Sequence, residues 1–432
     1  MDNAESNKAG KHKYETFAKT LFKWVFWGSI IGMATGSATA FFKIAVQFLT
    51  DKREANPYFL FFLPIGGIVI GYLYKHFGGE SDKGNNVVLE HIHHGQGTVP
   101  LRMGPLVFLA SFITHLFGGS TGREAAAVQM GGSITEAVNR LFRVNRTDRR
   151  ILFISGISSG FGSAFSAPLT GTVFGMEAVA LGQMKYEALV PCFISSLTAY
   201  FTTKAWGVPV DRHIIHEIPA MTADTVTKII IASIIFSFTS VLYSKLRHNI
   251  ERFSKKYLKD PMLIGMVGGI IIILLTYIVG SRDYTGRGLK LVTEAFEGQV
   301  PAYAFLAKIL FTAVTMGTGF RGGEAIPLFF IGATLGNTLS GVAGLPASFL
   351  AGIGLIAVFC GAANAPISCF LLSMEMFEGK GIIFFFIACV ISYLFSGHNG
   401  IYTSQKIYEP KSRMLNIPSG ERIDFFQQKK KG

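Results

Sequence analysis

Apolar runs that recur from Phe17 almost to Phe395 constrain this chain more than any other feature. Half of the residues are hydrophobic and only 16% are charged, a balance typical of chains whose surface lies largely in lipid. No stretch between the runs is long enough for a soluble domain of useful size. The sequence therefore predicts an all-α, polytopic membrane protein that forms one membrane unit.

Several of these apolar segments are too short or too interrupted to cross a bilayer simply. Pro100–Phe117 and Ala325–Leu339 are short and are cut by glycine and proline. Broken helices persist in hydrocarbon only where their ends are buried in protein or line a polar cavity, so they point to a binding site. We expect broken, tilted helices that meet near the middle of the membrane.

Both ends of the chain are polar and basic, and the first residues lack the pattern of a signal peptide. The positive-inside rule then places both termini in the cytoplasm, in a multi-pass protein of the cell membrane. The net charge of +13 is interpreted as solvated tails, so no nucleic-acid partner is predicted. The four cysteines occur singly inside apolar runs, which predicts small core residues rather than disulfides or metal ligands. No cofactor is predicted.

Two internal repeats are indicated by matching landmarks. Ser166–Val179 and Asn364–Phe377 both read Ala-Pro, seven residues, Met-Glu, and a glycine-rich turn opening into Glu-Ala precedes each of them. The offsets nearly agree, at 200 residues for the turns and 198 for the second landmark. We predict an N-terminal tail (1–16), two membrane repeats (17–209 and 221–396), a linker (210–220), and a final helix with a basic tail (397–432).

The second landmark ends at Glu177 in one repeat and at Glu375 in the other. Their matching positions indicate an architectural role, such as pairing with basic groups at a helix end.

Three glycine-rich turns precede interrupted helices, at Lys83–Glu90, Ser120–Val128 and Phe320–Leu328. Glycine frees the backbone to expose successive N–H groups at a helix N-terminus, where the helix dipole is positive. Such ends bind anions without a full basic charge. The alternative is that glycine only permits tight helix crossings. Three turns in a two-repeat frame favour the anion site.

Glu124 and Glu324 fall at two of these turns. An ionised carboxylate there can occupy the same N–H donors as a transported anion, and a protonated one releases them and carries a proton. The alternatives are structural pairing of Glu124 with Arg123 and of Glu324 with Arg321.

Two further features leave alternatives open. Tyr402 lies just past the glycine that interrupts the last apolar run, where its hydroxyl could bind a buried anion or sit in an interfacial belt. His91, His93 and His94 could ligate a metal, but they lack the i, i+4 spacing of a helical zinc motif. A polar loop is favoured over a membrane metalloenzyme, and no enzyme is predicted.

These residues resemble the CLC family of chloride channels and anion/proton antiporters along nearly the whole chain. The family signature Gly-Arg-Glu-Gly-Pro appears as Gly122-Arg123-Glu124-Ala125-Ala126, and Ser166–Val179 is similar to its Ala-Pro-Leu-x-Gly helix. The resemblance implies that Glu124 is the gating glutamate and Tyr402 the central tyrosine. It also implies two inverted repeats per subunit and a homodimer in the lipid bilayer with one pore in each subunit.

Departures from the family pattern are similar to its fluoride/proton antiporter branch. Asn85 stands in place of a chloride-coordinating serine, Glu324 is an added acid, and Ala178 replaces an inner proton glutamate. That branch would have threonine where Ile326 stands. The resemblance thus implies export of fluoride in exchange for protons, with Glu124 and Glu324 in gating and proton transfer. The anion-binding residues it implies are Gly84, Asn85, Asn86, Gly122, Arg123, Gly323, Ala325, Ile326 and Tyr402.

The alternative within the same fold is a chloride or nitrate exchanger coupled to protons, or a passive anion channel. Fluoride is small and strongly hydrated, so several amide donors would replace its water better than one hydroxyl.

Overall fold

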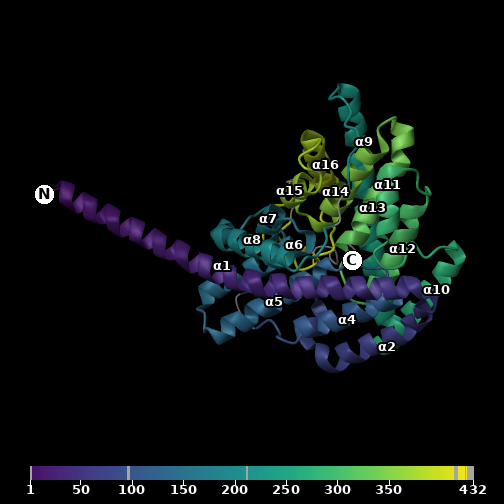
Figure 1. The fold of residues 1–432 in the computed structure, drawn as a ribbon, viewed down its shortest axis with the longest axis horizontal. Helices are drawn as coiled ribbons and strands as arrows, with labels where there is room; N and C mark the ends of the chain where they lie inside the picture. The colour runs from purple at the N-terminus through teal and green to yellow at the C-terminus, as the bar shows by residue number, and fades with distance from the viewer. Residues whose placement is uncertain (1, 95–97, 211–212, 413–416, 424, 426–432) are drawn as a thin grey trace.

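The computed structural model describes residues 2–94, 98–210, 213–412, 417–423 and 425, and it is built almost entirely of α-helices (Figure 1). The N-terminal end of α1 projects away from the body, and the rest of α1 crosses it. The helices of the first half are α1 (Asp2–Ala55), α2 (Leu63–Leu73), α3 (Asn85–His94), α4 (Met103–Phe117), α5 (Glu124–Leu141), α6 (Arg146–Phe165), α7 (Pro168–Glu177) and α8 (Leu189–Ala205).

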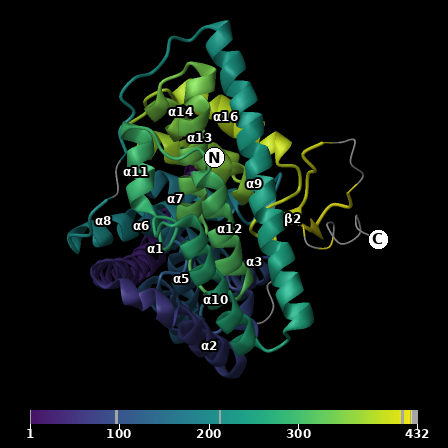
Figure 2. The ribbon, with the colours of Figure 1, turned by 90° about the vertical axis from the view of Figure 1, so that its right-hand side faces the viewer.

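In the described part of the second half, the chain forms α9 and seven further α-helices, of which α9 is the longest. Figure 2 shows them from another side. They are α9 (Ala223–Tyr257), α10 (Pro261–Val279), α11 (Leu289–Glu297), α12 (Ala304–Gly317), α13 (Ala325–Ala343), α14 (Ala347–Ala363), α15 (Pro366–Met376) and α16 (Ile382–Phe395). Shorter helical turns are η1 (Pro57–Phe62), η2 (Tyr74–Gly78), η3 (Gly79–Lys83) and η4 (Tyr186–Ala188).

Within the described residues, five helices are long and apolar enough to cross a membrane by length and composition. They are Glu15–Ala55, Pro57–Lys83, Ala223–Tyr257, Pro261–Val279 and Ala325–Ala343. Several others, such as Met103–Phe117, are apolar but shorter. Short helices end inside the protein because of their sequence: at Gly118 the backbone adopts φ +88°, which favours glycine, and α4 stops there.

The last segment of the chain differs from the prediction. We expected a final helix after Ser396. The described residues from there to Arg422 instead form loops and two short strands, β2 (Lys406–Ile407) and β3 (Glu421–Arg422), and only Ile423 and Phe425 among the described residues are helical. β2 pairs in parallel with β1 (Ala180–Leu181) and antiparallel with β3. The segment carries polar residues that need backbone and side-chain partners rather than lipid. The small sheet ties the C-terminal segment to the end of α7.

Close helix contacts depend on glycine where α2 meets α10. A Cβ atom on Gly67 would clash with the backbone of Gly265, and a Cβ atom on Gly265 would clash with the backbone of Gly67. Small residues allow membrane helices to approach each other closely, which is how α2 and α10 pack. This contact connects an element of the first half with one of the second.

The two halves are related around the glycine turns. Thr114 Oγ1 accepts a hydrogen bond from the N–H of Arg321 (3.3 Å), and Thr315 Oγ1 accepts one from the N–H of Ser120 (3.1 Å). The two contacts are equivalent: Thr315 follows Thr114 by 201 positions, and Arg321 follows Ser120 by the same number. The offset of 200 inferred from the Glu-Ala match is therefore wrong by one. Glu324 is equivalent to Arg123, and Glu124 is equivalent to Ala325.

Glu177 and Glu375 have the architectural role that the repeat predicted, but not through basic groups. Glu177 accepts hydrogen bonds from the N–H groups of Ile367 (3.0 Å) and Ser368 (2.7 Å), at the start of α15. Glu375 accepts from the N–H groups of Leu169 (2.9 Å) and Thr170 (2.8 Å), at the start of α7. Each repeat thus caps a helix of the other, because the first N–H groups of a helix lack partners within it.

Alanine at these caps is expected to lower the free energy of unfolding. Glu177→Ala should cost about 2 kcal/mol and Glu375→Ala about 1 kcal/mol, because Glu177 is the more buried and leaves the Ser368 donors without a partner. Thermal unfolding in detergent measures both values. Glu177→Gln, which keeps an acceptor oxygen, is the control and should lose less. A larger loss in Glu375→Ala would contradict this account.

Candidate functional site

The candidate site is built where the two repeats touch through their backbones. The N–H of Gly122 donates to the carbonyl of Gly323 (2.7 Å), and the N–H of Gly323 donates to the carbonyl of Gly122 (2.6 Å). Directly after this bridge, α5 begins at Glu124 and α13 begins at Ala325. Two helix N-termini therefore open side by side, which concentrates positive helix ends in one place.

The carboxylate of Glu124 lies in the space between these turns. Its Oε2 accepts a hydrogen bond from the backbone N–H of Arg123 (3.0 Å), and Glu124 is 3% exposed. A Cβ atom built on Gly323 would lie only 2.6 Å from this oxygen, so glycine leaves room for the carboxylate. The bond from Arg123 comes from its backbone, as expected for an acid that occupies an anion site.

Two cavities meet this region. Cavity 1, of 680 Å³, is lined by Gly84, Asn85, Asn86, Ala125, Glu324 and Tyr402, among others. Cavity 2, of 300 Å³, is lined by Lys43, Arg123, Glu124, Ile326 and Glu375, among others. Of the predicted site residues, five line cavity 1 (Gly84, Asn85, Asn86, Glu324 and Tyr402) and three line cavity 2 (Arg123, Glu124 and Ile326). Gly122, Gly323 and Ala325 line neither of these two cavities and belong to the bridged turns.

The start of α3 brings Asn85 and Asn86 to cavity 1. Gly84 adopts φ +59° before the helix, a conformation that favours glycine. The Oδ1 atom of Asn85 is buried and has no hydrogen-bond partner among the described residues. Asn86 instead bonds to the C-terminal segment, donating to Thr403 Oγ1 (3.2 Å) and accepting from the N–H of Ser404 (3.1 Å). Asn86 therefore positions the residues that follow Tyr402.

Tyr402 lies in a loop rather than in a helix. The N–H of the preceding residue, Ile401, donates to the carbonyl of Ala362 near the end of α14 (2.9 Å). The ring of Tyr402 meets that of Phe174 edge to face, with centroids 6.2 Å apart. These contacts hold the tyrosine at the wall of cavity 1, inside the protein, which disfavours the interfacial-belt alternative.

Glu324 has different partners from those the sequence indicated. Tyr243 donates its hydroxyl hydrogen to Glu324 Oε1 (2.6 Å), and Arg247 Nε lies 3.5 Å from the same oxygen. Arg321, the partner in the structural alternative, pairs with Asp82 and lies over the ring of Tyr74. The structural alternative of a Glu324–Arg321 pair is therefore not supported.

Tyr243 and Arg247 were not among the predicted residues. They lie four residues apart on α9 and so share one helix face. That spacing within an apolar run was the available signal, since a polar face on a membrane helix points into the protein.

His91 and His93 make separate contacts. The ring of His91 packs edge to face on Phe153 (4.6 Å), and His93 Nε2 is 2.9 Å from the carbonyl oxygen of Val179. The side chain of His94 lies outside the described residues. Over the described part of the chain, no group of three metal-binding side chains is found. The geometry gives the metalloenzyme alternative no support.

Comparisons with known proteins agree over most of the chain. The family model described as voltage gated chloride channel matches residues 66–397. A chloride/fluoride channel protein of Pseudomonas syringae pv. tomato is 38% identical over 412 residues, covering 94% of this chain and 91% of that protein. The chain belongs to the CLC family. The resemblance drawn from the glycine turns is confirmed.

Other CLC proteins give the same result at lower identity. The H(+)/Cl(-) exchange transporter ClcA of Vibrio parahaemolyticus is 24% identical over 401 residues, covering 84% of each chain. The crystal structure of a CLC-type fluoride/proton antiporter matches with a TM-score of 0.86 at 30% identity, covering 90% of this chain and 98% of that one. A slow cyanobacterial Cl⁻/H⁺ antiporter, at 18% identity and a TM-score of 0.73, covers 94% and 97% and shows the fold alone.

The predicted fold class is therefore confirmed, and this CLC chain is a multi-pass membrane protein. Its family is one of transport rather than of catalysis.

Proposed function

We propose that this CLC protein is a fluoride/proton antiporter that exports cytoplasmic fluoride in exchange for protons. The observation that carries the proposal is the carboxylate of Glu124, held by a backbone N–H between two glycine turns and two helix N-termini. A negative ion of similar size can use the same donors when Glu124 is protonated and moves away. Exchange of one negative group for the other couples anion movement to proton movement.

Fluoride as the substrate is supported by the relatives and by the side chains of cavity 1. One relative is named a chloride/fluoride channel protein, and a structural neighbour is described as a fluoride/proton antiporter. Asn85 brings an amide to cavity 1, where its NH₂ group can donate to a strong acceptor such as fluoride. Ile326 lies at cavity 2 and offers the anion no polar side-chain group.

The orientation of the protein in the membrane is inferred from the charges at its two faces. Lys23 and Arg53 are 30 residues apart in α1, about 45 Å of helix. Lys23 pairs with Asp148 (2.5 Å) in the first turn of α6. The start of α6 and the connection before it also carry Arg143, Arg146, Arg149 and Arg150. By the positive-inside rule this face is cytoplasmic.

Cavity 1 opens toward the same face. Pro261, the first residue of α10, lines cavity 1. Arg282, three residues past the end of that helix, lines a separate cavity together with Arg53. Cavity 1 is therefore at the Lys23 end and cytoplasmic, and fluoride would enter through it. Glu324, held by Tyr243 and Arg247 at its wall, would receive the proton carried inward by Glu124.

We further propose a homodimer in which each subunit has its own path.

The test is fluoride efflux from proteoliposomes, followed with a fluoride electrode at two pH values with chloride as the competing anion. A fluoride gradient alone should drive protons across the membrane, and the exchange should continue in excess chloride. Fluoride and chloride moving equally well with protons would favour the alternative of a chloride or nitrate exchanger. Anion flux without any proton movement would favour a passive channel.

Asn85→Ser is expected to weaken the preference for fluoride over chloride by about tenfold. A hydroxyl offers one hydrogen where the amide offers two, and small strongly hydrated ions depend most on donor number. The ratio of fluoride to chloride efflux in the same vesicles measures the change. Asn86→Ser serves as the control, because Asn86 bonds to Thr403 and Ser404. Unchanged selectivity in Asn85→Ser would remove Asn85 from the anion path.

A further inference from the structure

A third cavity, of 510 Å³, lies at the ends of α1 and α10 that face away from cavity 1. Six charged residues line it: the cations Arg53, Arg282, Arg287 and Lys290, and the acids Glu54 and Asp283. Four cations against two acids leave an excess of two positive charges. The proposed exchange of fluoride and protons uses none of these residues.

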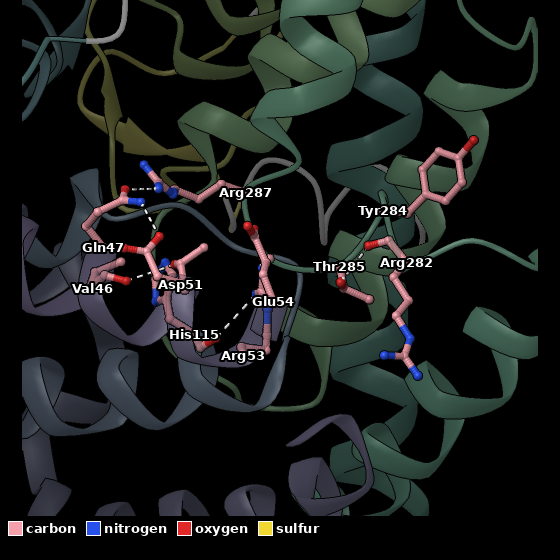
Figure 3. Close-up of polar contacts among 12 residues, drawn as sticks. Val46, Gln47, Asp51, Arg53, Glu54, His115, Arg282, Tyr284, Thr285 and Arg287 are labelled. Carbon is pink, nitrogen blue, oxygen red and sulfur yellow. Dashed lines mark hydrogen bonds and ion pairs between the residues drawn. The ribbon is translucent and has the colours of Figure 1, made fainter. Parts of the chain in front are cut away.

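Two guanidinium groups that line this cavity form hydrogen bonds drawn in Figure 3. Arg53 Nη1 donates to the carbonyl of His115 (3.3 Å), and Arg287 Nη2 donates to Gln47 Oε1 (2.6 Å). Gln47 in turn donates to Asp51 Oδ1 (2.7 Å), which locks its amide. Arg287 is only 5% exposed. Arginine held in this way presents a planar set of donors that suits an oxyanion.

Exposed aromatic side chains lie beside the basic cavity. Pro57 and Leu60 of η1 line the cavity, and their neighbours Tyr58, Phe61 and Phe62 are 75%, 46% and 48% exposed. Across from them Tyr277, near the end of α10, is 62% exposed, and its ring lies 6.3 Å from that of Phe61. Aromatic residues at the ends of membrane helices mark the depth of the lipid headgroups.

We propose that this cavity binds the phosphate group of an anionic phospholipid. The arginines would hold the phosphate oxygens, and the aromatic side chains around η1 and α10 would contact the upper part of the acyl chains. Inorganic phosphate shares the headgroup chemistry but cannot use the aromatic rim. The combination of a basic cavity and exposed aromatic residues next to its lining therefore favours lipid over a dissolved ion.

The experiment measures lipid binding and needs no transport. The full-length protein in detergent is given phosphatidylglycerol, phosphatidylcholine or inorganic phosphate, and the retained lipid is counted by native mass spectrometry while unfolding is followed by heating. We expect phosphatidylglycerol to be retained and to raise the unfolding temperature, with little effect of the other two. Arg53→Gln and Arg282→Gln should each weaken this binding about tenfold, as for the loss of one charge-assisted contact.

Arg282→Gln keeps the test valid if Arg53→Gln folds poorly, because Arg282 is exposed and its described bonds to Thr285 come from its carbonyl. Lys52→Gln is the matched control. It removes one charge from α1 at the residue just before Arg53, and Lys52 does not line the cavity. Equal loss of binding in Lys52→Gln would show a general charge effect and overturn the proposal. Equal stabilisation by inorganic phosphate would also overturn it, since the source would then be a dissolved ion.

Discussion

Replacing Glu124 by glutamine is expected to abolish fluoride-driven proton transport. Glutamine has almost the same shape, so it can still lie between the turns of Gly122 and Gly323 and accept the hydrogen bond from Arg123. It cannot lose or carry a proton at any pH of interest. Proton uptake by vesicles under a fluoride gradient should therefore fall to that of protein-free vesicles, while any remaining fluoride flux is uncoupled.

The matched control for this variant is Glu177→Gln. Glu177 is also a buried carboxylate that accepts backbone hydrogen bonds at a helix start, but it lines none of the three cavities. Its coupling ratio should equal that of the wild type. If Glu124→Gln still moved protons with fluoride at the normal ratio, the exchange of a carboxylate for an anion would not be the mechanism.

The second large effect is expected for Gly323→Ala, in which one added methyl group should strongly reduce fluoride efflux. A Cβ atom there would lie 2.6 Å from Oε2 and 2.8 Å from the backbone nitrogen of Glu124, closer than atoms pack in proteins. The methyl would fill the space in which the carboxylate lies and in which the anion is proposed to bind. Overpacking of this kind costs about 1–3 kcal/mol, so we expect fluoride efflux to fall about ten- to a hundredfold.

Gly341→Ala separates this local effect from a general one. Gly341 is in the same helix, α13, and a Cβ atom there would meet nothing within 4 Å. Efflux is measured per mole of protein that elutes as a single species from gel filtration, with the unfolding temperature recorded for both variants. Loss of efflux in Gly341→Ala, or full activity in Gly323→Ala, would contradict the assignment of the turn to the anion path.

Sequence patterns predicted the fold class and the turns at Gly122 and Gly323 because both depend on local features. Apolar runs predict membrane helices, and glycine before a broken helix predicts an exposed helix start. The partners of Glu324 were not predictable in this way. Tyr243 is 81 residues from Glu324 in the chain, and only the packing of α9 against α13 brings the two together.

The register of the repeats was misjudged for a related reason. The Glu-Ala letters match at Glu124 and Glu324, but the backbone pairs Gly122 with Gly323, so one acid starts a helix and the other precedes it. Residue types alone cannot show that Glu124 and Glu324 occupy different positions relative to the helix start. The C-terminal segment was misjudged because its fold depends on β1, more than 200 residues earlier in the chain.

The bridge between the turns at Gly122 and Gly323 consists of two main-chain hydrogen bonds, one donated by each half of the molecule. Peptide groups are the same whatever side chains they carry. Substitutions nearby can therefore alter which ion passes without breaking the hydrogen bonds between Gly122 and Gly323. Neither half could form the bridge alone, since each supplies one N–H donor and one carbonyl acceptor to it.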